Sequence, residues 1–322
     1  MCSGVRFSDN NGNMYFGRNL DWSVGFGQKV VITPRKYTLN SAFLGERSSK
    51  YALIGMGIVV EGTPLYFDCG NEAGLAVAGL NFPGYAQYED IPVQGKNNIA
   101  AYEFPLWVAM NFQSVDEAEA ALENTAIVAK PFNEHYPVSL LHWIIGDKDR
   151  SIVVEYTKNG MEVFKDDVDV LTNQPGFEWH RENLRNYMNT DSSMPENVEW
   201  RDAGMKPFGA GSLMRGIPGD YYSTSRFVRA AYHNTHYPVK STEEENVSRL
   251  FHTLASVSMI DGASQMSDGN YEKTIYTGGF SSATNTYYFN TYEDFGVKSV
   301  SLEDYGIDGG KVIEVDPCHG SV

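Results

Sequence analysis

The hydrophobic pattern of the first third of the chain predicts closely spaced strands. Val5 and Phe7 alternate with polar neighbours, the turn sequence Asn-Asn-Gly-Asn follows at 10–13, and residues 14–16 begin a return strand. Further short runs, rich in β-branched and aromatic residues and bounded by Gly, Pro or Asn, span residues 29–33, 51–60, 65–69 and 75–80. Several of these runs are apolar on both faces, so we expect sheets that are covered on both sides.

Helical patterns interrupt these strands. Ser114 and Glu117 have the spacing of a capping box and predict a helix that continues to about Val128. Residues 241–244 (Ser-Thr-Glu-Glu) form a second box, and the apolar residues after it recur at helical spacing: Val247, Leu250, Phe251, Leu254 and Val257. Further helices are predicted over 102–112 and 178–188, and strands over 274–277, 286–292, 297–302 and 311–315. This order predicts an α+β fold with helices packed against mostly antiparallel sheets.

The chain shows no sequence boundary between domains. A length of 322 residues corresponds to about two average domains, but no segment is of low complexity and no period repeats. The 13 Pro and 31 Gly are scattered rather than pooled into a linker. We therefore expect residues 1–322 to form a single domain. The N-terminus has no apolar signal segment and no apolar run approaches the ~18 residues of a membrane span, so we expect no membrane association.

Charge and cysteine content exclude several classes of function. Lys and Arg total 25 against 41 Asp and Glu, a net charge of −16, which disfavours a surface that neutralises nucleic-acid phosphates. The three cysteines, Cys2, Cys69 and Cys318, make neither a disulfide framework nor a four-thiolate zinc site, and indicate a reducing compartment, the cytoplasm. The histidines lack metal-binding spacing and no nucleotide-binding glycine motif occurs, so we expect no metal and no cofactor.

Cys2 is the residue whose position has a chemical consequence. A small second residue allows removal of Met1, which would leave Cys2 with a free thiol and a free α-amine. Free groups of these types have pKa values of ~8.5 and ~7.7–8.0, so the pair can exchange a proton near neutral pH without a distant histidine. Arg18 returns across the 10–13 turn and would favour the thiolate, and Asp21 could hold the ammonium. Each residue alone also has an ordinary interpretation, as a buried cysteine or a surface ion pair.

Five segments together resemble one family. They are Met-Cys-Ser-Gly-Val-Arg-Phe at 1–7, Phe-Gly-Arg-Asn-Leu-Asp-Trp at 16–22, Ala-Gly-Leu-Asn-Phe-Pro-Gly-Tyr at 78–85, Leu-Thr-Asn-Gln-Pro at 171–175, and Gly-Ile-Pro-Gly-Asp with Ser-Arg-Phe-Val-Arg within 216–229. From residue 2 to about 293 the chain is similar to the choloylglycine hydrolases, closest to bacterial bile salt hydrolases. The resemblance implies an N-terminal-nucleophile hydrolase with a four-layer αββα sandwich, usually a homotetramer. Its substrates would be bile salts, cleaved at the amide between the bile acid and glycine or taurine.

The resemblance also implies roles for particular residues. Cys2 would be the nucleophile and its freed α-amine the proton acceptor and donor, with Arg18 and Asp21 setting their environment. The side-chain amide of Asn173 and the backbone N–H of Asn81 would stabilise the oxyanion, each such donor being worth roughly 2.7–4 kcal/mol. Arg226 matches a second active-site arginine. Without the resemblance, turn formation would explain both asparagines.

Substrate contacts and assembly follow from the resemblance in less detail. Leu20 and Phe26 match positions that line the apolar side of the substrate pocket, and Phe132 and Leu140 lie in a loop that does so. Core packing is the ordinary explanation for any one of them. The segment from Trp200 to Pro218 corresponds to a protruding assembly segment.

Other functions remain open at this point. The penicillin V acylases share most of these motifs but commonly have Tyr where this chain has Asn81, so Asn81 favours bile salts; penicillin V and N-acyl homoserine lactones are the alternative substrates. A protein that binds apolar ligands without turnover is the non-enzymatic alternative. A papain-like pair of Cys69 and His142 is disfavoured, because Cys69 ends a strand-like run rather than opening a helix.

Overall fold

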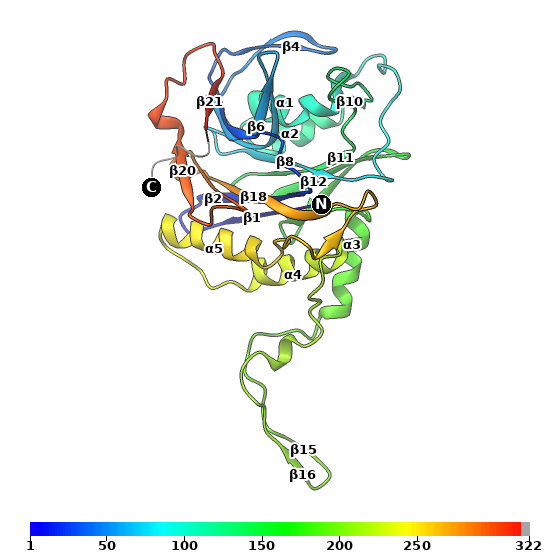
Figure 1. The fold of residues 1–322 in the computed structure, drawn as a ribbon, viewed down its shortest axis with the longest axis vertical. Helices are drawn as coiled ribbons and strands as arrows, with labels where there is room; N and C mark the ends of the chain where they lie inside the picture. Colours follow the sequence, from blue (N-terminus) through cyan, green and yellow to red (C-terminus); the bar gives the residue numbers. More distant parts are fainter. Residues whose placement is uncertain (317–322) are drawn as a thin grey trace.

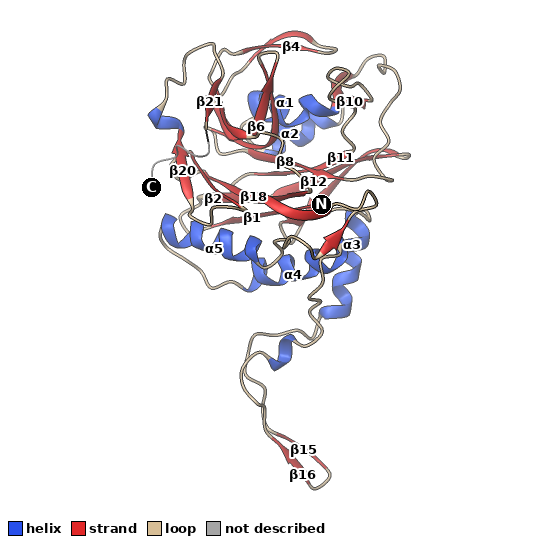
Figure 2. Ribbon diagram, viewed as in Figure 1, coloured by secondary structure: helices blue, strands red, loops and turns tan. Residues whose placement is uncertain are grey.

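Two large antiparallel sheets form the centre of the protein (Figures 1 and 2). The computed structural model describes residues 1–316. Sheet 1 has the order β14 (Val170–Leu171), β1 (Cys2–Ser8), β2 (Met14–Trp22), β18 (Tyr271–Ser281), β19 (Thr286–Thr291) and β20 (Lys298–Ser301), and β17 (Ser264–Gln265) pairs with β18. Sheet 2 has the order β13 (Gly160–Asp166), β12 (Ser151–Thr157), β11 (Leu141–Gly146), β8 (Ala76–Asn81), β7 (Thr63–Asn71), β6 (Leu53–Val60), β3 (Lys29–Thr33) and β21 (Ile313–Val315).

Helices cover the outer face of each sheet, which gives the predicted four-layer αββα stack (Figure 2). Helices α4 (Ser223–His236) and α5 (Glu243–Ala255) pack on sheet 1, and α1 (Phe104–Asn111) and α2 (Val115–Leu122) lie on the side of sheet 2. One buried apolar cluster joins the two sheets with α4 and α5, and a second fills the space between sheet 2 and α1 and α2. Sheets covered on both faces explain why their strands read as apolar on both sides.

Smaller elements complete the described chain. Two-stranded pairs are formed by β4 (Thr38–Ser41) with β5 (Gly45–Ser48), by β9 (Asn97–Ala100) with β10 (Thr125–Val128), and by β15 (Val198–Trp200) with β16 (Ala203–Met205). The short helices are α3 (Phe177–Asn183), η1 (Ala101–Glu103), η2 (Leu184–Tyr187), η3 (Ser212–Met214) and η4 (Leu302–Asp304). In the described residues, no helix is both long enough and apolar enough to cross a bilayer.

Two predicted helix boundaries are wrong. The helix that Ser114 caps ends at Leu122, and residues 125–128 form β10 instead of its last turns. The buried β-branched side chains of Thr125, Ile127 and Val128 favour a strand, and β9 supplies a parallel partner for it. The second capping box begins at Thr242 rather than Ser241. Thr242 accepts a hydrogen bond from the backbone N–H of Glu245, whose carboxylate accepts from the N–H of Thr242.

The first hairpin and two β-bulges position the residues near Cys2. In the register of β1 and β2, Cys2 lies opposite Leu20 and Gly4 lies opposite Arg18. Met56 of β6 pairs with Asp68 of β7, and the next residue, Gly57, pairs with Tyr66, so Phe67 is an extra residue on β7. Ile275 is the corresponding extra residue on β18. Bulges redirect side chains and often lie beside active sites.

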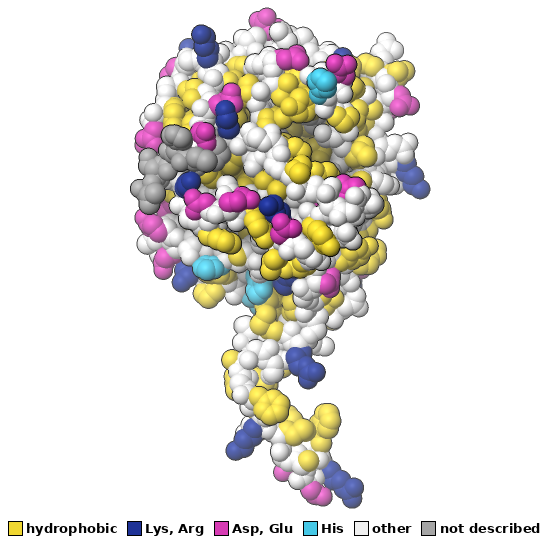
Figure 3. Space-filling view, in the orientation of Figure 1, with side chains coloured by type: hydrophobic (Ala, Val, Ile, Leu, Met, Phe, Trp, Pro, Cys, Tyr) yellow, Lys and Arg dark blue, Asp and Glu magenta, His cyan; other side chains and the backbone are white. Residues whose placement is uncertain are grey.

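An arm projects away from the stacked sheets. It is the segment between η2 and α4, residues 188–222, and it ends in the β15–β16 hairpin (Figure 1). Apolar side chains are spread along it (Figure 3), and those exposed to solvent are Met188, Met194, Val198, Trp200, Met205, Phe208 and Tyr222. The arm includes the segment from Trp200 to Pro218 that the sequence indicated for assembly.

Candidate active site

The thiol of Cys2 lies against the guanidinium of Arg18 inside the stack. Cys2 begins β1 and is 6% exposed, and Arg18 on β2 is 1% exposed. Nη2 of Arg18 donates a hydrogen bond to Sγ of Cys2 over 2.7 Å. Burial alone would lower the pKa of Arg18, but nearby Cys2, Tyr276 and Asp68 raise it overall. A permanent cation at hydrogen-bonding distance favours the thiolate form of a cysteine.

A second buried arginine, Arg226, approaches Cys2 from the first turns of α4. Its Nη1 donates to the carbonyl oxygen of Cys2 over 2.6 Å and to Oγ of Ser3 over 2.7 Å. Its Nη2 donates to Oδ1 of Asn173 over 2.6 Å. Burial lowers the pKa of Arg226, and the nearby Asp21 and Cys2 oppose that shift. Arg226 therefore fixes the backbone of Cys2 and the orientation of Asn173 together.

The side chain of Asn173 joins Cys2 to Asn81. Its Oδ1 accepts from the backbone N–H of Cys2 over 2.8 Å, and its Nδ2 donates to the carbonyl oxygen of Asn81 over 2.7 Å. Because Oδ1 is held by two donors, the amide cannot flip without losing both bonds. The second Nδ2 hydrogen has no partner among the described residues, so it can serve as a donor to a ligand.

A buried polar framework that sequence reasoning missed holds the loop of Asn173. Oγ of Ser223 accepts from the N–H of Asn173 over 3.0 Å, and Nε2 of His180 lies 2.9 Å from its carbonyl oxygen. His142 lies 3.0 Å from the carbonyl oxygen of Thr172 and 3.1 Å from the Glu155 carboxylate. Burial lowers the pKa of His180 to about 4. Polar residues among apolar neighbours were the only sequence signal for this framework.

Asp21 lies at the other side of Cys2 and pairs with Met1. The backbone N–H of Asp21 donates to the carbonyl oxygen of Met1 over 2.9 Å, and the α-amine of Met1 donates to the carbonyl oxygen of Asp21 over 2.7 Å. That amine also contacts the carboxylate of Glu272 at 2.7 Å. Oδ1 of Asp21 accepts from the hydroxyl of Thr274 over 2.6 Å, whereas Oδ2 is buried and has no hydrogen-bond partner among the described residues. Burial raises the pKa of this carboxyl group.

The four predicted pocket residues lie at different distances from this centre. Leu20 is buried directly across the ladder from Cys2. The exposed ring of Phe26 lies 5.5 Å from that of Phe67, whose carbonyl oxygen accepts from Nη1 of Arg18. Leu140 has an exposed side chain, and its carbonyl oxygen accepts a hydrogen bond from the backbone N–H of Phe82, the residue after Asn81. Phe132 instead packs edge-on against Tyr102 and Tyr136, and no contact in the described structure ties it to Cys2.

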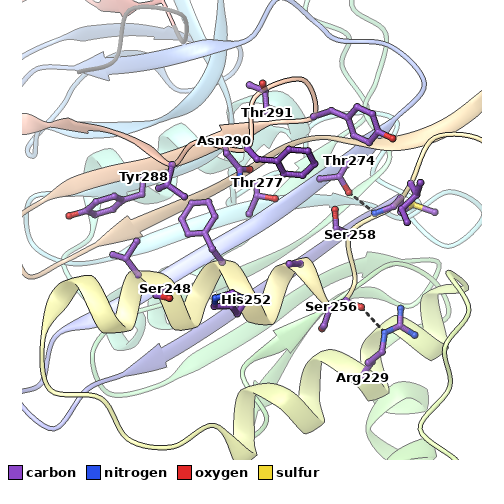
Figure 4. A pocket seen from close by; sticks show the side chains of 18 of the residues that line it. Arg229, Ser248, His252, Ser256, Ser258, Thr274, Thr277, Tyr288, Asn290 and Thr291 are labelled. Carbon is purple, nitrogen blue, oxygen red and sulfur yellow. Dashed lines mark hydrogen bonds between the residues drawn. The ribbon is translucent and has the colours of Figure 1, made fainter. Parts of the chain in front are cut away.

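A pocket of about 1120 Å³ lies on the helix-covered face of sheet 1, between α5 and strands β18 and β19 (Figure 4). Phe251, Tyr288 and Phe295 contribute apolar walls. Thr274 lines this pocket and also donates to Asp21, so the pocket reaches the helix side of the Cys2 centre.

Cys69 and His142, the disfavoured papain-like pair, have separate surroundings. Sγ of Cys69 lies 3.9 Å from the carbonyl oxygen of Pro105 in α1, and burial raises the pKa of this thiol well above its usual range. The ring of His142 stacks on Phe82 at 4.1 Å. Cys318, the third cysteine, lies outside the described residues.

The layered fold and the centre around Cys2 define a hydrolase of the N-terminal-nucleophile type. An αββα stack that begins its central strand with a cysteine beside a buried arginine has the parts that such an enzyme needs. The chain belongs to the choloylglycine hydrolase family: a family model described as linear amide C-N hydrolases, choloylglycine hydrolase family, matches residues 2–314.

Known relatives agree with this assignment. A bile salt hydrolase/transferase of Bifidobacterium longum subsp. longum is 55% identical, covering 98% of this chain and 99% of the relative. A conjugated bile acid hydrolase of Lactobacillus gasseri is 47% identical over 97% and 99% of the two chains. The solved structure of the C2A mutant of the conjugated bile acid hydrolase from Clostridium perfringens has a TM-score of 0.92 at 34% identity, covering 98% of this chain and 97% of that one. Penicillin V acylase from Agrobacterium tumefaciens shares the fold, with a TM-score of 0.78 at 20% identity over 98% and 91% of the two chains.

Proposed function

We propose that this protein hydrolyses conjugated bile salts at the amide bond between the bile acid and glycine or taurine. The observation that carries the proposal is the hydrogen bond from Arg18 to the Cys2 thiol, in a chain that is 55% identical to a protein named bile salt hydrolase/transferase. It supports Cys2 as a sulfur nucleophile that a fixed cation prepares for attack.

The proposal requires removal of Met1. In the full chain the nitrogen of Cys2 is a peptide nitrogen and cannot accept a proton, whereas removal of Met1 would make it a free amine next to the thiol. Oδ1 of Asn173 already accepts from this nitrogen. Oδ2 of Asp21 is buried and has no hydrogen-bond partner within residues 1–316, so it is a second acceptor that could hold the ammonium form. A purified protein that retains Met1 and is nevertheless active would exclude the α-amine as the base.

The proposed reaction has two steps. The Cys2 thiol gives its proton to the α-amine, and the sulfur attacks the substrate carbonyl carbon. The second Nδ2 hydrogen of Asn173 and the backbone N–H of Asn81 donate to the oxyanion, where each donor is worth roughly 2.7–4 kcal/mol. The α-ammonium protonates the departing glycine or taurine nitrogen, leaving a Cys2 thioester. Water, deprotonated by the amine, then releases the bile acid and regenerates the thiol.

An apolar substrate body would lie on the Phe26 and Leu140 side of the centre. Both side chains are exposed; the Phe26 ring packs on Phe67, which bonds Arg18, and the backbone of Leu140 bonds the residue after Asn81. Burial of a steroid against such side chains would supply most of the affinity, at about 25 cal/mol per Å² of apolar surface. Leu20, opposite Cys2, would contribute the base of the same surface, and Phe132 would contribute its rim on the ground of family resemblance alone. Asn81, in place of the tyrosine common in penicillin V acylases, favours bile salts over penicillin V.

The working form we propose is a cytoplasmic homotetramer of single-domain subunits. The arm supports the assembly, because apolar side chains lie along its surface (Figure 3), and the large side chains of Trp200 and Phe208 are exposed. Free, buried Cys2 and Cys69 agree with a reducing compartment.

Side-by-side kinetics test the substrate. We expect kcat/KM to be highest for glycocholate or taurocholate and at least about tenfold lower for penicillin V, which is ~1.4 kcal/mol of transition-state discrimination. Correctly processed Cys2→Ala should give no release of glycine or taurine above the background. Penicillin V as the better substrate would replace the proposal by an acylase, and no turnover of any of the three would indicate a binding protein.

A further inference from the structure

A buried carboxylate, Asp68, is among the groups that raise the pKa of Arg18, and it has no part in the reaction described above. It is 2% exposed. The hydroxyl of Tyr276 donates to its Oδ1 over 2.5 Å and that of Tyr287 to its Oδ2 over 2.6 Å. Both tyrosine side chains are fully buried, so this carboxylate has two fixed donors and no contact with bulk water. Such a group is costly to bury unless its charge is compensated.

The bulge on β7 directs this carboxylate across the space between the sheets. Asp68 belongs to sheet 2, whereas Arg18, Tyr276 and Tyr287 belong to sheet 1. The extra residue of the bulge, Phe67, turns its carbonyl oxygen to Nη1 of Arg18 over 3.3 Å. The next residue is Asp68, and Cζ of Arg18 lies 5.9 Å from the ring centre of Tyr276. The guanidinium therefore bonds both the Cys2 sulfur and the carbonyl oxygen next to Asp68, and it lies over the ring of a tyrosine that donates to Asp68.

Gly278 leaves the space that this arrangement needs. It lies opposite Arg18 in the register of β18 and β2. A Cβ atom at this position would lie 2.0 Å from Oη and 2.8 Å from Cζ of Tyr287. Any side chain at 278 would displace the hydroxyl that donates to Asp68, so the glycine is required by a close approach and not by backbone conformation.

The charges in the cluster are mutually dependent. Burial raises the pKa of Asp68, while Arg18 and the two tyrosine hydroxyls lower it. Burial and the neighbouring carboxylate raise the pKa values of Tyr276 and Tyr287 well above their usual range, so both remain donors. The electrostatic potentials of a cation and a nearby anion add with opposite signs, so the Asp68 charge offsets part of the Arg18 charge.

We propose that Asp68, held by Tyr276 and Tyr287, is a positioning residue that fixes Arg18 against Cys2 and limits how strongly Arg18 stabilises the thiolate. The inference rests on the proposed role of Cys2 as nucleophile. The carboxylate makes no hydrogen bond to Cys2 in the described residues and is linked to it by the Phe67 carbonyl oxygen and Arg18. The ionisable groups that face Arg18 or Cys2 from the surrounding elements are Asp68 on β7, Tyr276 on β18, Tyr287 on β19, Arg226 on α4, and Asp21 on β2.

Alkylation of Cys2 by iodoacetamide across pH tests this inference without a bile salt. The rate follows the thiolate fraction, and N-terminal peptide mass locates the label on Cys2. In Asp68→Asn, Arg18 acts on the sulfur alone, so we expect the midpoint of the pH–rate curve to move down by roughly half a pH unit or more. In Tyr287→Phe, the Asp68 carboxylate keeps its charge but loses one of its two hydroxyl donors. Its charge is then less compensated and offsets more of the Arg18 charge, so we expect the midpoint of the pH–rate curve to move up by roughly a few tenths of a unit.

Tyr66→Phe is the matched control. Tyr66, on β7, is a buried tyrosine like Tyr287. Its hydroxyl, however, bonds with the Thr33 hydroxyl and the carbonyl oxygen of Val31. This variant should keep the midpoint of the unsubstituted protein.

Opposite shifts in Asp68→Asn and Tyr287→Phe support the inference; unchanged midpoints, or shifts in the same direction, overturn it. If Asp68→Asn does not fold, Tyr287→Phe decides alone: an upward shift supports the inference and any other result overturns it. Because no substrate is used, failure here is separate from failure of bile salt hydrolysis.

Discussion

Arg18 reaches the sulfur of Cys2 diagonally across the first hairpin, with Nη2 at 2.7 Å from Sγ. The residue directly opposite Arg18 is Gly4, which has no side chain to block this path. Diagonal neighbours on one face of an antiparallel pair lie within reach of a long side chain. A tight turn at residues 10–13 is therefore enough to bring a cation to the second residue of the chain.

Loss of this contact should slow catalysis more than it weakens substrate binding. A hydrogen bond to a charged group is worth about 1.5–3 kcal/mol, so Arg18→Gln should lower kcat/KM by about ten- to a hundredfold. Steady-state kinetics with glycocholate measure the effect. Arg47→Gln, at an exposed arginine on β5, is the control and should leave the rate unchanged. An Arg18→Gln enzyme within twofold of the unsubstituted rate would show that the cation is dispensable.

Removal of the amide at Asn173 should reduce kcat and leave KM nearly unchanged. The free Nδ2 hydrogen would act on the oxyanion, which exists only after attack, so Asn173→Ala should cost about 10²–10³ in kcat. Asn186→Ala changes an exposed asparagine in η2 and serves as the control. If Asn173→Ala raises KM and keeps kcat, Asn173 binds the ground state and is not an oxyanion donor.

Acid should destabilise the fold through His180. Its pKa is about 4 in the folded protein and ~6.5 when unfolded, so the unfolded chain binds the proton more tightly. Stability from this group is complete above pH ~6.5 and is lost as pH falls towards 4, by roughly 3 kcal/mol. Urea unfolding between pH 4 and 7.5 measures the loss.

His180→Asn should flatten that pH dependence, whereas the exposed His252→Gln should preserve it. The buried carboxyl groups titrate in both proteins, so the difference between the two curves isolates His180. Parallel curves for His180→Asn and the unsubstituted protein would mean that His180 accepts its proton in the folded state.

The arm should control the oligomeric state. Light scattering on a size-exclusion column is expected to give a tetramer for the unsubstituted protein and a smaller species for Trp200→Ser with Phe208→Ser. Exposed apolar side chains of this size are typical interface anchors. Ile91→Ser, at an exposed apolar residue outside the arm, should remain tetrameric. A monomeric unsubstituted protein, or a doubly substituted tetramer, contradicts the proposal.

Local patterns were sufficient to predict the parts of the fold that depend on neighbouring residues. The strand at 29–33 is confirmed as β3, and the hairpin turn at 10–13 is confirmed between β1 and β2. Residues 125–128 were predicted as helix because the strand that pairs with them, β9, lies 25 or more residues away in sequence. Pairing with β9 in the folded protein determines that residues 125–128 form a strand.

The centre around Cys2 could be predicted only in part, for a similar reason. Cys2 and Arg18 are close through one hairpin, and the remaining expected residues came from family resemblance. Ser223, His180 and Asp68 were missed, because each lies on an element distant in sequence from its partners and none has a motif of its own. Asp68 is a single acid in an apolar run, and only the bulge at Phe67 shows why it is there.

The covalent intermediate on Cys2 is the most direct test of the account. Processed enzyme is mixed with glycocholate, quenched in acid within one turnover, digested, and its N-terminal peptide is weighed by mass spectrometry. We predict a peptide that begins at Cys2, lacks Met1 and carries one cholyl group lost on treatment with hydroxylamine. Turnover with a cholyl group on another residue, or with an N-terminal peptide that is never modified, would contradict Cys2 as the nucleophile.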